Sequence, residues 1–493
     1  MESYRQIEAA MILLLSILSL QCGVATAALL QEGQLYVGWA GRNITPDEPV
    51  VLEGSFHLRI AKDAANPVTC TALAIETREG EKVIDQAVMV SCDLVGITRQ
   101  VQEKVREAVK TKLPDLSPRK IFLNATHTHT APVTRAWVRD IPVEGVMQPE
   151  EYIEFLTARV ADAVVEAWNN RKPSAVSWAL GQAVIGYNRR AIYSEPQSNW
   201  IGTYTSAMYG KTDVDIFCGI EGYEDHGAEM LFFWDDSEKL TGILINITCP
   251  SQEREAEERI SADFWHDARV AIRQRHGEGL FIFGQCGAAG DQSPHPIWRK
   301  AAKAEMLKRK GLTSWQELGL RVAKAVDEVM PYAKKDIRRK VVFRHIVEEI
   351  GLPRRMVTKA EHDESLQNYE KWKDKQSDQR AGWFKRVVDR YNNQQSESPH
   401  FPMELHVIRL CDIAIASNPF ELFLDFGVRM EARSKAVMTL IVQLSCDYSG
   451  YLPTAKAVAG GHYSATVQSN NVGPEGGQVL VDETVKRINE MWE

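Results

Sequence analysis

The chain of 493 residues lacks the marks of several protein classes. Its eight cysteines are scattered and form no CxxC pair, and the chain is too long for a small disulfide scaffold. Basic residues are not in excess: the formal net charge is −8, which provides no electrostatic footprint for nucleic acid or an anionic membrane. Beyond the N-terminal segment, no apolar run is long enough to cross a bilayer. The sequence also contains no internal repeat and no low-complexity tract.

The first thirty residues, MESYRQIEAAMILLLSILSLQCGVATAALL, have the composition of an export signal. One arginine precedes a short apolar run over 9–20, and the small-residue pattern Ala25-Thr26-Ala27 follows it. This order predicts a signal peptide over 1–27, removed after Ala27, and export through the secretory route to a periplasm or the medium. A lipid anchor on Cys22 and an uncleaved N-terminal anchor are the alternatives.

Apolar and β-branched runs alternate with helical patterns along the rest of the chain. This alternation predicts an α/β or layered α+β fold, in which mixed β-sheets are flanked by helices. We expect one large catalytic domain over 28–493. Within it, the charged segment of about 354–396 has no proline before position 399 and predicts a helical insertion with exposed surfaces.

The segment FLNATHTHTAP, residues 122–132, places two histidines two positions apart after an apolar run. On a strand, residues i and i+2 point to the same face, so His127 and His129 can face one site. Imidazole is a frequent zinc ligand near neutral pH. From this pattern alone, the alternative is that both histidines are buried structural residues and bind no metal.

Unusual small and polar residues also follow four other predicted strands. Open α/β sheets gather their sites at the carboxyl ends of strands, and small residues let backbone approach a ligand closely. The four segments are CPSQ (249–252), GQCGAAGDQSPHP (284–296), NPFE (418–421) and DYSGYLPT (447–454).

With these motifs the chain resembles the neutral/alkaline non-lysosomal ceramidase family, zinc-dependent amidases of the secretory route. The resemblance runs from VGWAGRNITP (37–46) to the tail GPEGGQVLVDETV, and its most specific pieces are THTH, GDQSP and the SGYLPT…HY block. It implies the N-terminal catalytic domain of the family, in a divergent member that lacks the C-terminal β-rich domain.

The resemblance also implies a set of zinc ligands. The first THTH histidine, the glutamate of NPFE and the tyrosine of SGYLPT match ligands of the family, while a cysteine stands where the family has its second zinc histidine. The implied ligands are His127, Cys249, Glu421 and Tyr451. Thiolate is a good zinc ligand, but Cys249 is also compatible with a packed small residue, in which case His57 or His462 is a candidate replacement.

Four further residues match the family's reacting groups. His129 corresponds to a histidine close to the reacting centre, and Arg189 to an arginine that recognises the substrate amide. The serine of GDQSP corresponds to a nucleophile or a substrate contact. The implied catalytic set is His129, Arg189, Ser293 and Tyr463.

These assignments imply a secreted zinc-dependent hydrolase of lipid, and specifically sphingolipid, metabolism. It would cleave the amide bond of ceramide or of a related small or lipid N-acyl substrate by attack of zinc-activated water, with Arg189 and Tyr463 stabilising the oxyanion. An esterase or glycan-active hydrolase with the same pocket is the second hypothesis. A non-catalytic binding protein with a metal site that has decayed at Cys249 is the third. The sequence indicates no particular protein partner.

Overall fold

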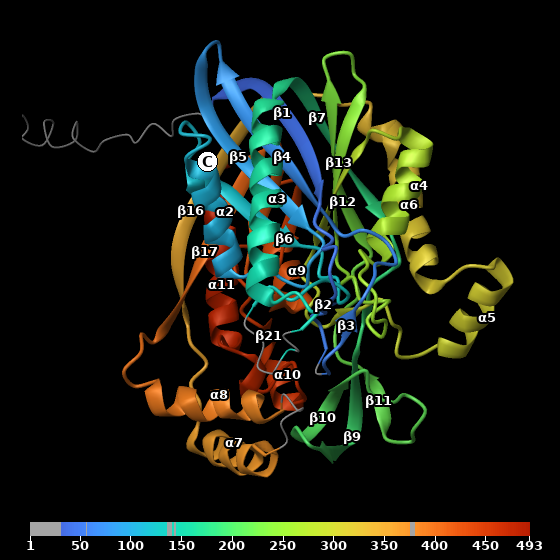
Figure 1. Ribbon diagram of the computed structural model, residues 1–493, viewed down its shortest axis with the longest axis vertical. Coiled ribbons are helices and arrows are strands. Elements are labelled where there is room, and N and C mark those ends of the chain that lie inside the picture. Colours follow the sequence, from blue (N-terminus) through green and yellow to red (C-terminus); the bar gives the residue numbers. More distant parts are fainter. Residues whose placement is uncertain (1–30, 56, 136–140, 142–143, 375–379) are drawn as a thin grey trace, which may run out of the picture.

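The computed structural model describes residues 31–55, 57–135, 141, 144–374 and 380–493, so the predicted signal peptide lies outside the described residues. The predicted α/β fold is confirmed: a 12-stranded mixed sheet forms the centre (Figure 1). Its main path runs β14 (Phe281–Cys286), β13 (Leu240–Ile247), β12 (Gly227–Asp235), β7 (Lys172–Gln182), β1 (Glu32–Asn43), β16 (Lys340–Pro353), β17 (His400–Leu410), β18 (Ile413–Ser417), β20 (Met438–Val442). Off this path, β4 (Thr69–Glu79) pairs with β1, and β5 (Lys82–Cys92) joins β4 to β6 (Ile121–Ala125).

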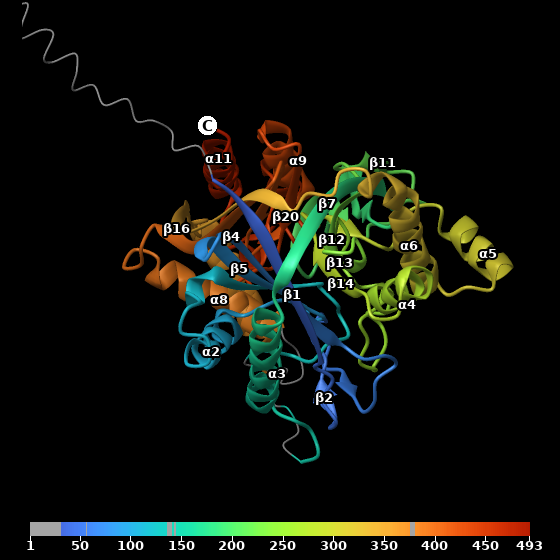
Figure 2. The same cartoon turned by 90° about the horizontal axis from the view of Figure 1, so that it is seen from above.

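Helices surround the sheet on several sides (Figure 2). They are α2 (Arg99–Lys110) and α3 (Pro149–Asn169), α4 (Phe264–His276) and α6 (Ser314–Ala333), and α9 (Leu424–Arg433) and α11 (Pro474–Glu490). In α2, Val101, Val105 and Val109 recur every four residues and are buried, so one helix face lies in the core. The hydroxyl of Thr98 accepts a hydrogen bond from the Val101 N–H and caps the helix start.

Three pairs of parallel strands determine where the site lies. They are β5 with β6, β13 with β14, and β18 with β20. Hydrogen bonds join one pair to the next: the Gln443 N–H donates to Cys286 O at 3.1 Å, and the Cys446 N–H donates to Leu123 O at 3.1 Å. The segments that follow all three pairs therefore emerge close together, although they are far apart in the sequence.

Short elements stand in the segments between the longer strands and helices. They are β2 (Val50–Val51), β3 (Ile60–Ala61), β8 (Tyr187–Asn188), β15 (Gln292–Ser293), β19 (Glu421–Leu422), β21 (Tyr451–Leu452), α5 (Lys300–Lys310), α10 (Ala455–Gly460) and the 3-10 turns Pro118–Lys120 and Val467–Ser469. A separate three-stranded sheet consists of β9 (Arg190–Asn199), β10 (Gly202–Met208) and β11 (Phe217–Ile220).

Two helices, α7 (Lys359–Trp372) and α8 (Arg380–Asn393), lie within the range 354–396. They form the lower left of the molecule in Figure 1, while β9, β10 and β11 form its lower right. Three aromatic residues of these helices lie in the interior. A buried cluster joins Trp372, Trp383 and Phe384 to Ile201. The two helices are therefore attached to the three-stranded sheet by apolar packing. Within the described ranges, no helix combines the length and the apolar character needed to span a membrane.

A buried carboxyl group on β12 predicts a specific pH dependence of stability. Burial and the neighbouring Asp225 raise the pKa of Glu229 to about 8. The folded state thus favours the protonated form, and this contribution to stability is present below the ordinary glutamate pKa and lost as the pH rises toward 8. We expect Glu229→Gln to raise the free energy of unfolding by about 3 kcal/mol at pH 8.5 and by much less at pH 5.

Urea unfolding of the wild type and of Glu229→Gln at the two pH values measures this difference. The exposed Glu278, replaced by glutamine, is the matched control and is expected to show no such pH-dependent gain. An equal effect of Glu229→Gln at both pH values would contradict the prediction.

Candidate active site

His127 and His129 lie just beyond β6 rather than on it. The strand ends at Ala125, and the backbone of His127 has a φ of 63°, so the expected strand alternation does not apply to the pair. The turn nevertheless brings the two rings together, with 3.4 Å between their Nε2 atoms. The Nδ1 of His127 lies 2.6 Å from Val95 O, to which it donates, and this leaves Nε2 as the acceptor nitrogen of the neutral ring.

Glu421, on β19, faces the Nε2 of His127. Its Oε2 lies 3.5 Å from His127 Nε2. The short parallel pair β19 and β21 sets Glu421 beside Tyr451, and the Tyr448 hydroxyl donates to Glu421 Oε1 at 2.9 Å. Burial alone raises the pKa of the Glu421 carboxyl, but the protonated form of His127, the Tyr451 hydroxyl and the charge of Arg189 outweigh burial and lower that pKa to about 2. The carboxylate is therefore ionised in the interior.

Arg189 brings a buried positive charge to the same place. Its guanidinium donates to the Tyr209 hydroxyl at 2.7 Å and to Gly290 O at 3.0 Å, and lies 3.5 Å from the Tyr451 hydroxyl. Its buried Nε has no hydrogen-bond partner in the structure. A buried donor without a partner is costly in a folded chain and is typical of a group kept for a ligand.

Ser293 is fully buried and lies within a group of hydrogen-bond donors. Its Oγ accepts from Gln252 Nε2 at 3.1 Å, from the Tyr209 hydroxyl at 3.3 Å and from the His295 backbone N–H at 3.1 Å. Across the described residues, no imidazole or carboxylate contacts this oxygen as a base. The geometry therefore favours a substrate contact over an activated nucleophile, the two roles that the sequence left open.

Tyr463 completes the group from the C-terminal segment. Its ring lies 6.1 Å from the ring of Tyr451. Burial raises the pKa of both phenols above the usual range, so that without a bound metal both are neutral hydroxyls that can donate. The site thus offers two phenols beside the Arg189 guanidinium.

Cys249 is the predicted site residue that the structure does not bring to this group. Its thiol faces Ile185 O at 3.4 Å and Pro250 O at 3.5 Å, and the side chain is packed in an apolar cluster. Burial raises the pKa of the thiol well above its ordinary value. The neighbouring loop residue Gln252 reaches the site instead. Of the two alternative histidines, His57 is exposed, and the Nδ1 of His462 accepts from the Met208 N–H.

Several residues of the site carried no assignment from the sequence. Tyr448 stands in the same DYSGYLPT block as Tyr451, and its position there was a usable signal. Gln252 and Glu255 follow Cys249 closely, but nothing in their spacing distinguishes them from surface residues. Tyr209 lies after β10 in a segment without any motif, and only the tertiary structure brings it to Arg189.

The donor atoms near His127 fit a zinc ion. Zinc bonds to nitrogen and oxygen are about 2.0–2.1 Å, which separates two ligand atoms of a tetrahedral site by roughly 3.4 Å. The distance from His127 Nε2 to Glu421 Oε2 is 3.5 Å, so these two atoms have the spacing of two ligands of one ion. The nitrogen of His127 that faces the others is also the one without a hydrogen. The Tyr451 hydroxyl, which hydrogen-bonds to Glu421, supplies a further oxygen.

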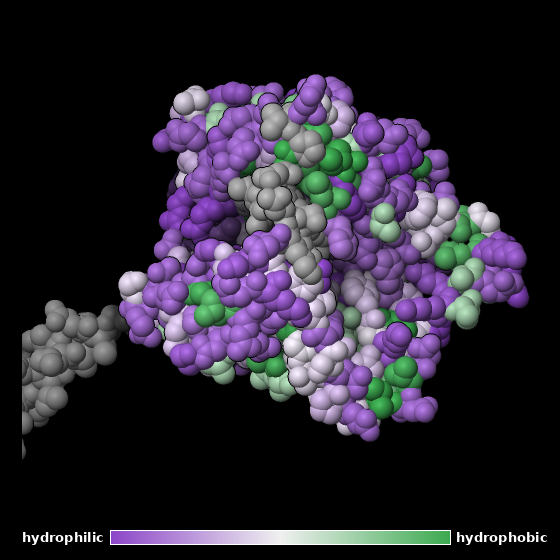
Figure 3. Space-filling model, turned by 60° about the horizontal axis from the view of Figure 1, so that its bottom comes forward, coloured by the Kyte–Doolittle hydropathy of each residue, from purple (hydrophilic) through white to green (hydrophobic). Residues whose placement is uncertain are grey.

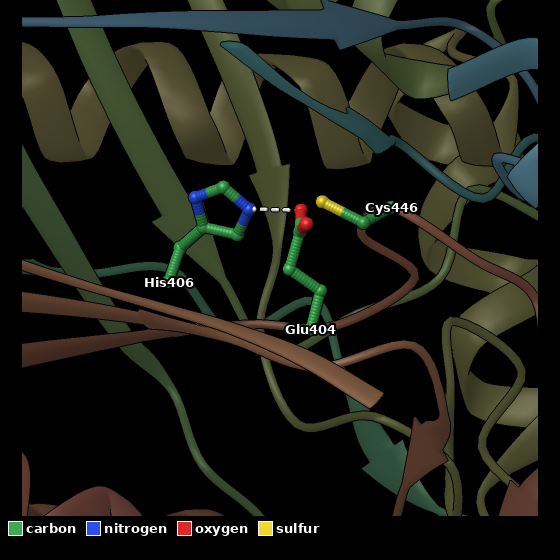
Figure 4. Close-up of side chains that lie close together, drawn as sticks. All are labelled: Glu404, His406 and Cys446. Atoms are coloured by element: carbon green, nitrogen blue, oxygen red, sulfur yellow. Dashed lines mark hydrogen bonds and ion pairs between the residues drawn. The ribbon is translucent and has the colours of Figure 1, made fainter. Parts of the chain in front are cut away.

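Among the described residues, the group of three metal-ligating side chains whose ligand atoms all lie within 4.8 Å of one another is a different one: Glu404, His406 and Cys446 (Figure 4). Its carboxylate already accepts hydrogen bonds from both terminal nitrogens of Arg106 and from His406 Nε2 at 2.7 Å. The His406 Nδ1 in turn lies 2.9 Å from the Nε2 of His345. Because Arg106 neutralises Glu404, we interpret this group as a structural hydrogen-bond network.

Asp93 supports the histidine segment from behind. Its carboxylate accepts from Arg269 at 2.7 and 2.9 Å and from the Thr126 hydroxyl at 3.2 Å. The arginine compensates the charge, and the threonine contact anchors the residue that directly precedes His127. Asp93 thereby holds the segment that carries His127.

Gly54 makes room for His129, and this predicts a steric effect. A Cβ at Gly54 would lie 2.6 Å from His129 Cγ. We expect Gly54→Ala to lower the free energy of unfolding by about 1–3 kcal/mol more than Gly80→Ala, through overpacking. Gly80 is the matched control, because its φ is also positive at +60° but a Cβ added there would meet nothing within 4 Å. Urea unfolding measures both variants, and equal losses would contradict the assigned crowding.

Two ceramidase structures resemble this chain, whereas comparisons by sequence find no match. No protein-family model matches the chain, and no curated protein sequence matches it. Among solved structures, the neutral ceramidase from Pseudomonas aeruginosa aligns with a TM-score of 0.64 and 16% identity, over 93% of this chain and 75% of that chain. A structure of a ceramidase complexed with C2 aligns with the same TM-score and identity, over 92% and 74%. The chain therefore has a ceramidase-like fold.

Proposed function

We propose that this protein is a zinc-dependent hydrolase that cleaves the amide bond of an N-acyl substrate, ceramide-like N-acylsphingosine or a related compound. The observation that carries the proposal is the convergence of His127, His129 and Glu421 beside the buried Arg189. One imidazole nitrogen and a carboxylate at ligand spacing, with a second imidazole and a guanidinium nitrogen without a hydrogen-bond partner close by, suit the hydrolysis of an uncharged carbonyl compound. The ceramidase-like fold supports the same reaction class.

The proposed metal ligands are His127, Glu421 and Tyr451. Bound zinc supplies a Lewis acid that polarises a carbonyl and lowers the pKa of water to roughly 7. Val95 fixes the tautomer of His127 through its carbonyl oxygen, and Tyr448 orients the carboxylate of Glu421. We leave Cys249 out of the proposed set, because its thiol faces away.

The remaining residues bind and orient the substrate and move the proton. Arg189 and the Tyr463 hydroxyl donate to the carbonyl oxygen as negative charge develops on it. Ser293 contacts the substrate close to the amide. His129 accepts a proton from the attacking water through Nε2 and returns it to the amide nitrogen as the C–N bond breaks, yielding an amine and a carboxylate.

The surface does not by itself select the substrate. The face in Figure 3 is hydrophilic over most of its visible area, with apolar residues in separate patches. This pattern is compatible with a lipid whose head enters the site and with a soluble N-acyl compound. We propose that the protein acts after export, in a periplasm or outside the cell, as the predicted signal peptide over 1–27 implies.

Bound metal and hydrolysis test the proposal together. We expect the purified wild type to hold about one zinc ion and to hydrolyse N-acylsphingosine or another N-acyl compound, and a chelator to abolish this activity reversibly. His127→Ala is expected to lose zinc and to lower kcat/KM by at least about 100-fold. His276→Ala, which removes a histidine paired with Asp327, is the control.

The same assay separates the other hypotheses. Ester and glycosidic analogues cleaved in place of amides would favour the esterase or glycan-active hydrolase. Wild-type protein without metal and without hydrolysis of any of these would favour the binding protein. Full activity of metal-free His127→Ala would contradict the proposed mechanism.

Cys249 provides a second, independent prediction. Because its thiol is packed against apolar side chains and faces two backbone carbonyls, we expect Cys249→Ala to lower the free energy of unfolding by about 1 kcal/mol. Zinc content and kcat/KM are expected to stay within about threefold of the wild type. Metal analysis of the dialysed variant measures this, and a loss of zinc comparable to that of His127→Ala would identify Cys249 as a ligand.

A further inference from the structure

The loop that follows β13 carries a carboxylate between two histidines of the site. Glu255 Oε2 lies 3.2 Å from His129 Nδ1, and its Oε1 lies 3.6 Å from His295 Nδ1. His129 comes from the segment after β6, and His295 comes from the segment after β15. One side chain therefore connects two parts of the site that the sequence separates by more than 160 residues.

The neighbouring carboxylate has a different partner. Glu253 pairs with His295 Nε2 at 3.1 Å and with Lys303 Nζ at 3.4 Å. Glu255, in contrast, forms no ion pair with a lysine or arginine of the described chain. Its two ion-pair contacts are the two histidines, so its negative charge is available to the imidazoles.

Hydrogen bonds to the backbones of Glu255 and His129 hold the two residues beside each other. Arg59 donates from one terminal nitrogen to Glu255 O at 2.5 Å and from the other to His129 O at 2.6 Å. The His129 N–H donates to Ser251 O at 3.1 Å, within the same loop. The arginine and the loop therefore set the separation of the two side chains independently of any ligand.

We propose that Glu255 is a positioning residue, which holds the hydrogen of His129 on Nδ1 and directs Nε2 toward the reacting centre. A neutral imidazole has one donor and one acceptor nitrogen, and a carboxylate beside Nδ1 selects the tautomer with the hydrogen there. The Nδ1 of His129 lies close to the Glu255 carboxylate, but the angle between them departs from that of a hydrogen bond, so Nδ1 has no hydrogen-bond partner in this structure. A small rotation of either side chain aligns it, as often happens when a site binds its substrate.

The expected effect of Glu255 on turnover rests on the proposed function. Its contact with His129 and the tautomer it selects do not. No motif of the family resemblance covers position 255.

Two substitutions at one position test the inference. Glu255→Ala removes the acceptor, whereas Glu255→Gln retains an amide oxygen that can accept from Nδ1 without a charge. We expect Glu255→Ala to lower kcat by about 10–100-fold, with KM within threefold and zinc content unchanged. Glu255→Gln is expected to recover most of that loss. Glu258→Ala, an exposed glutamate of the same loop, is the control and should leave kcat unchanged.

Nitrogen-15 NMR of the imidazoles gives a readout that does not depend on turnover. The His129 signals, assigned by their absence in His129→Ala, are expected to show the Nδ1–H tautomer in the wild type and a mixture in Glu255→Ala. An unchanged tautomer in Glu255→Ala, or a loss of kcat that merely follows a loss of zinc, would overturn the inference. A wild type that cleaves no amide overturns the proposed function alone, and the tautomer still decides the role of Glu255.

Discussion

The site depends on the direct junction of strands from three parallel pairs. Parallel strands end at the same edge, so each pair delivers two chain segments to one place. The Gln443 and Cys446 N–H groups join the end of β20 to β14 and β6 through backbone hydrogen bonds, and Asn246 Nδ2 donates to Ile441 O at 3.0 Å. These buried hydrogen bonds align the ends of the pairs. Without them, the histidines, the glutamate and the serine would remain on separate edges of a large sheet.

The segments beyond the strand ends are short and are held by contacts with one another. Glu421 and Tyr451 pair through β19 and β21, and Ser293 pairs with Tyr187 through β15 and β8. Arg59 connects the loop of Glu255 to the backbone of His129. Each segment thus limits the positions of its neighbours, which preorganises the donor atoms before a ligand binds.

Electrostatics in the site are dominated by burial and by a few close pairs. Contacts with His127 and Tyr451 keep the Glu421 carboxylate ionised. Burial raises the pKa of the Tyr451 and Tyr463 phenols by more than the charge of Arg189 lowers it, so both stay neutral. Arg189 has no carboxylate in direct contact among the described residues, and its hydrogen bonds go to the phenols of Tyr209 and Tyr451 and to the Gly290 carbonyl. Its charge is therefore available to a developing oxyanion, which suits amide hydrolysis.

The sequence by itself determined the α/β fold, through the alternation of strand and helix patterns, and it singled out the His127 and His129 pair and four strand-end segments. The rest of the predicted set followed from the resemblance to the ceramidase family: Cys249, Glu421, Tyr451, Arg189, Ser293 and Tyr463. Only the tertiary structure decided the orientation of Cys249, whose thiol faces Ile185, and the arrival of Tyr209, Gln252 and Glu255. Side-chain direction in loops depends on contacts between distant segments, and local sequence patterns do not encode such contacts.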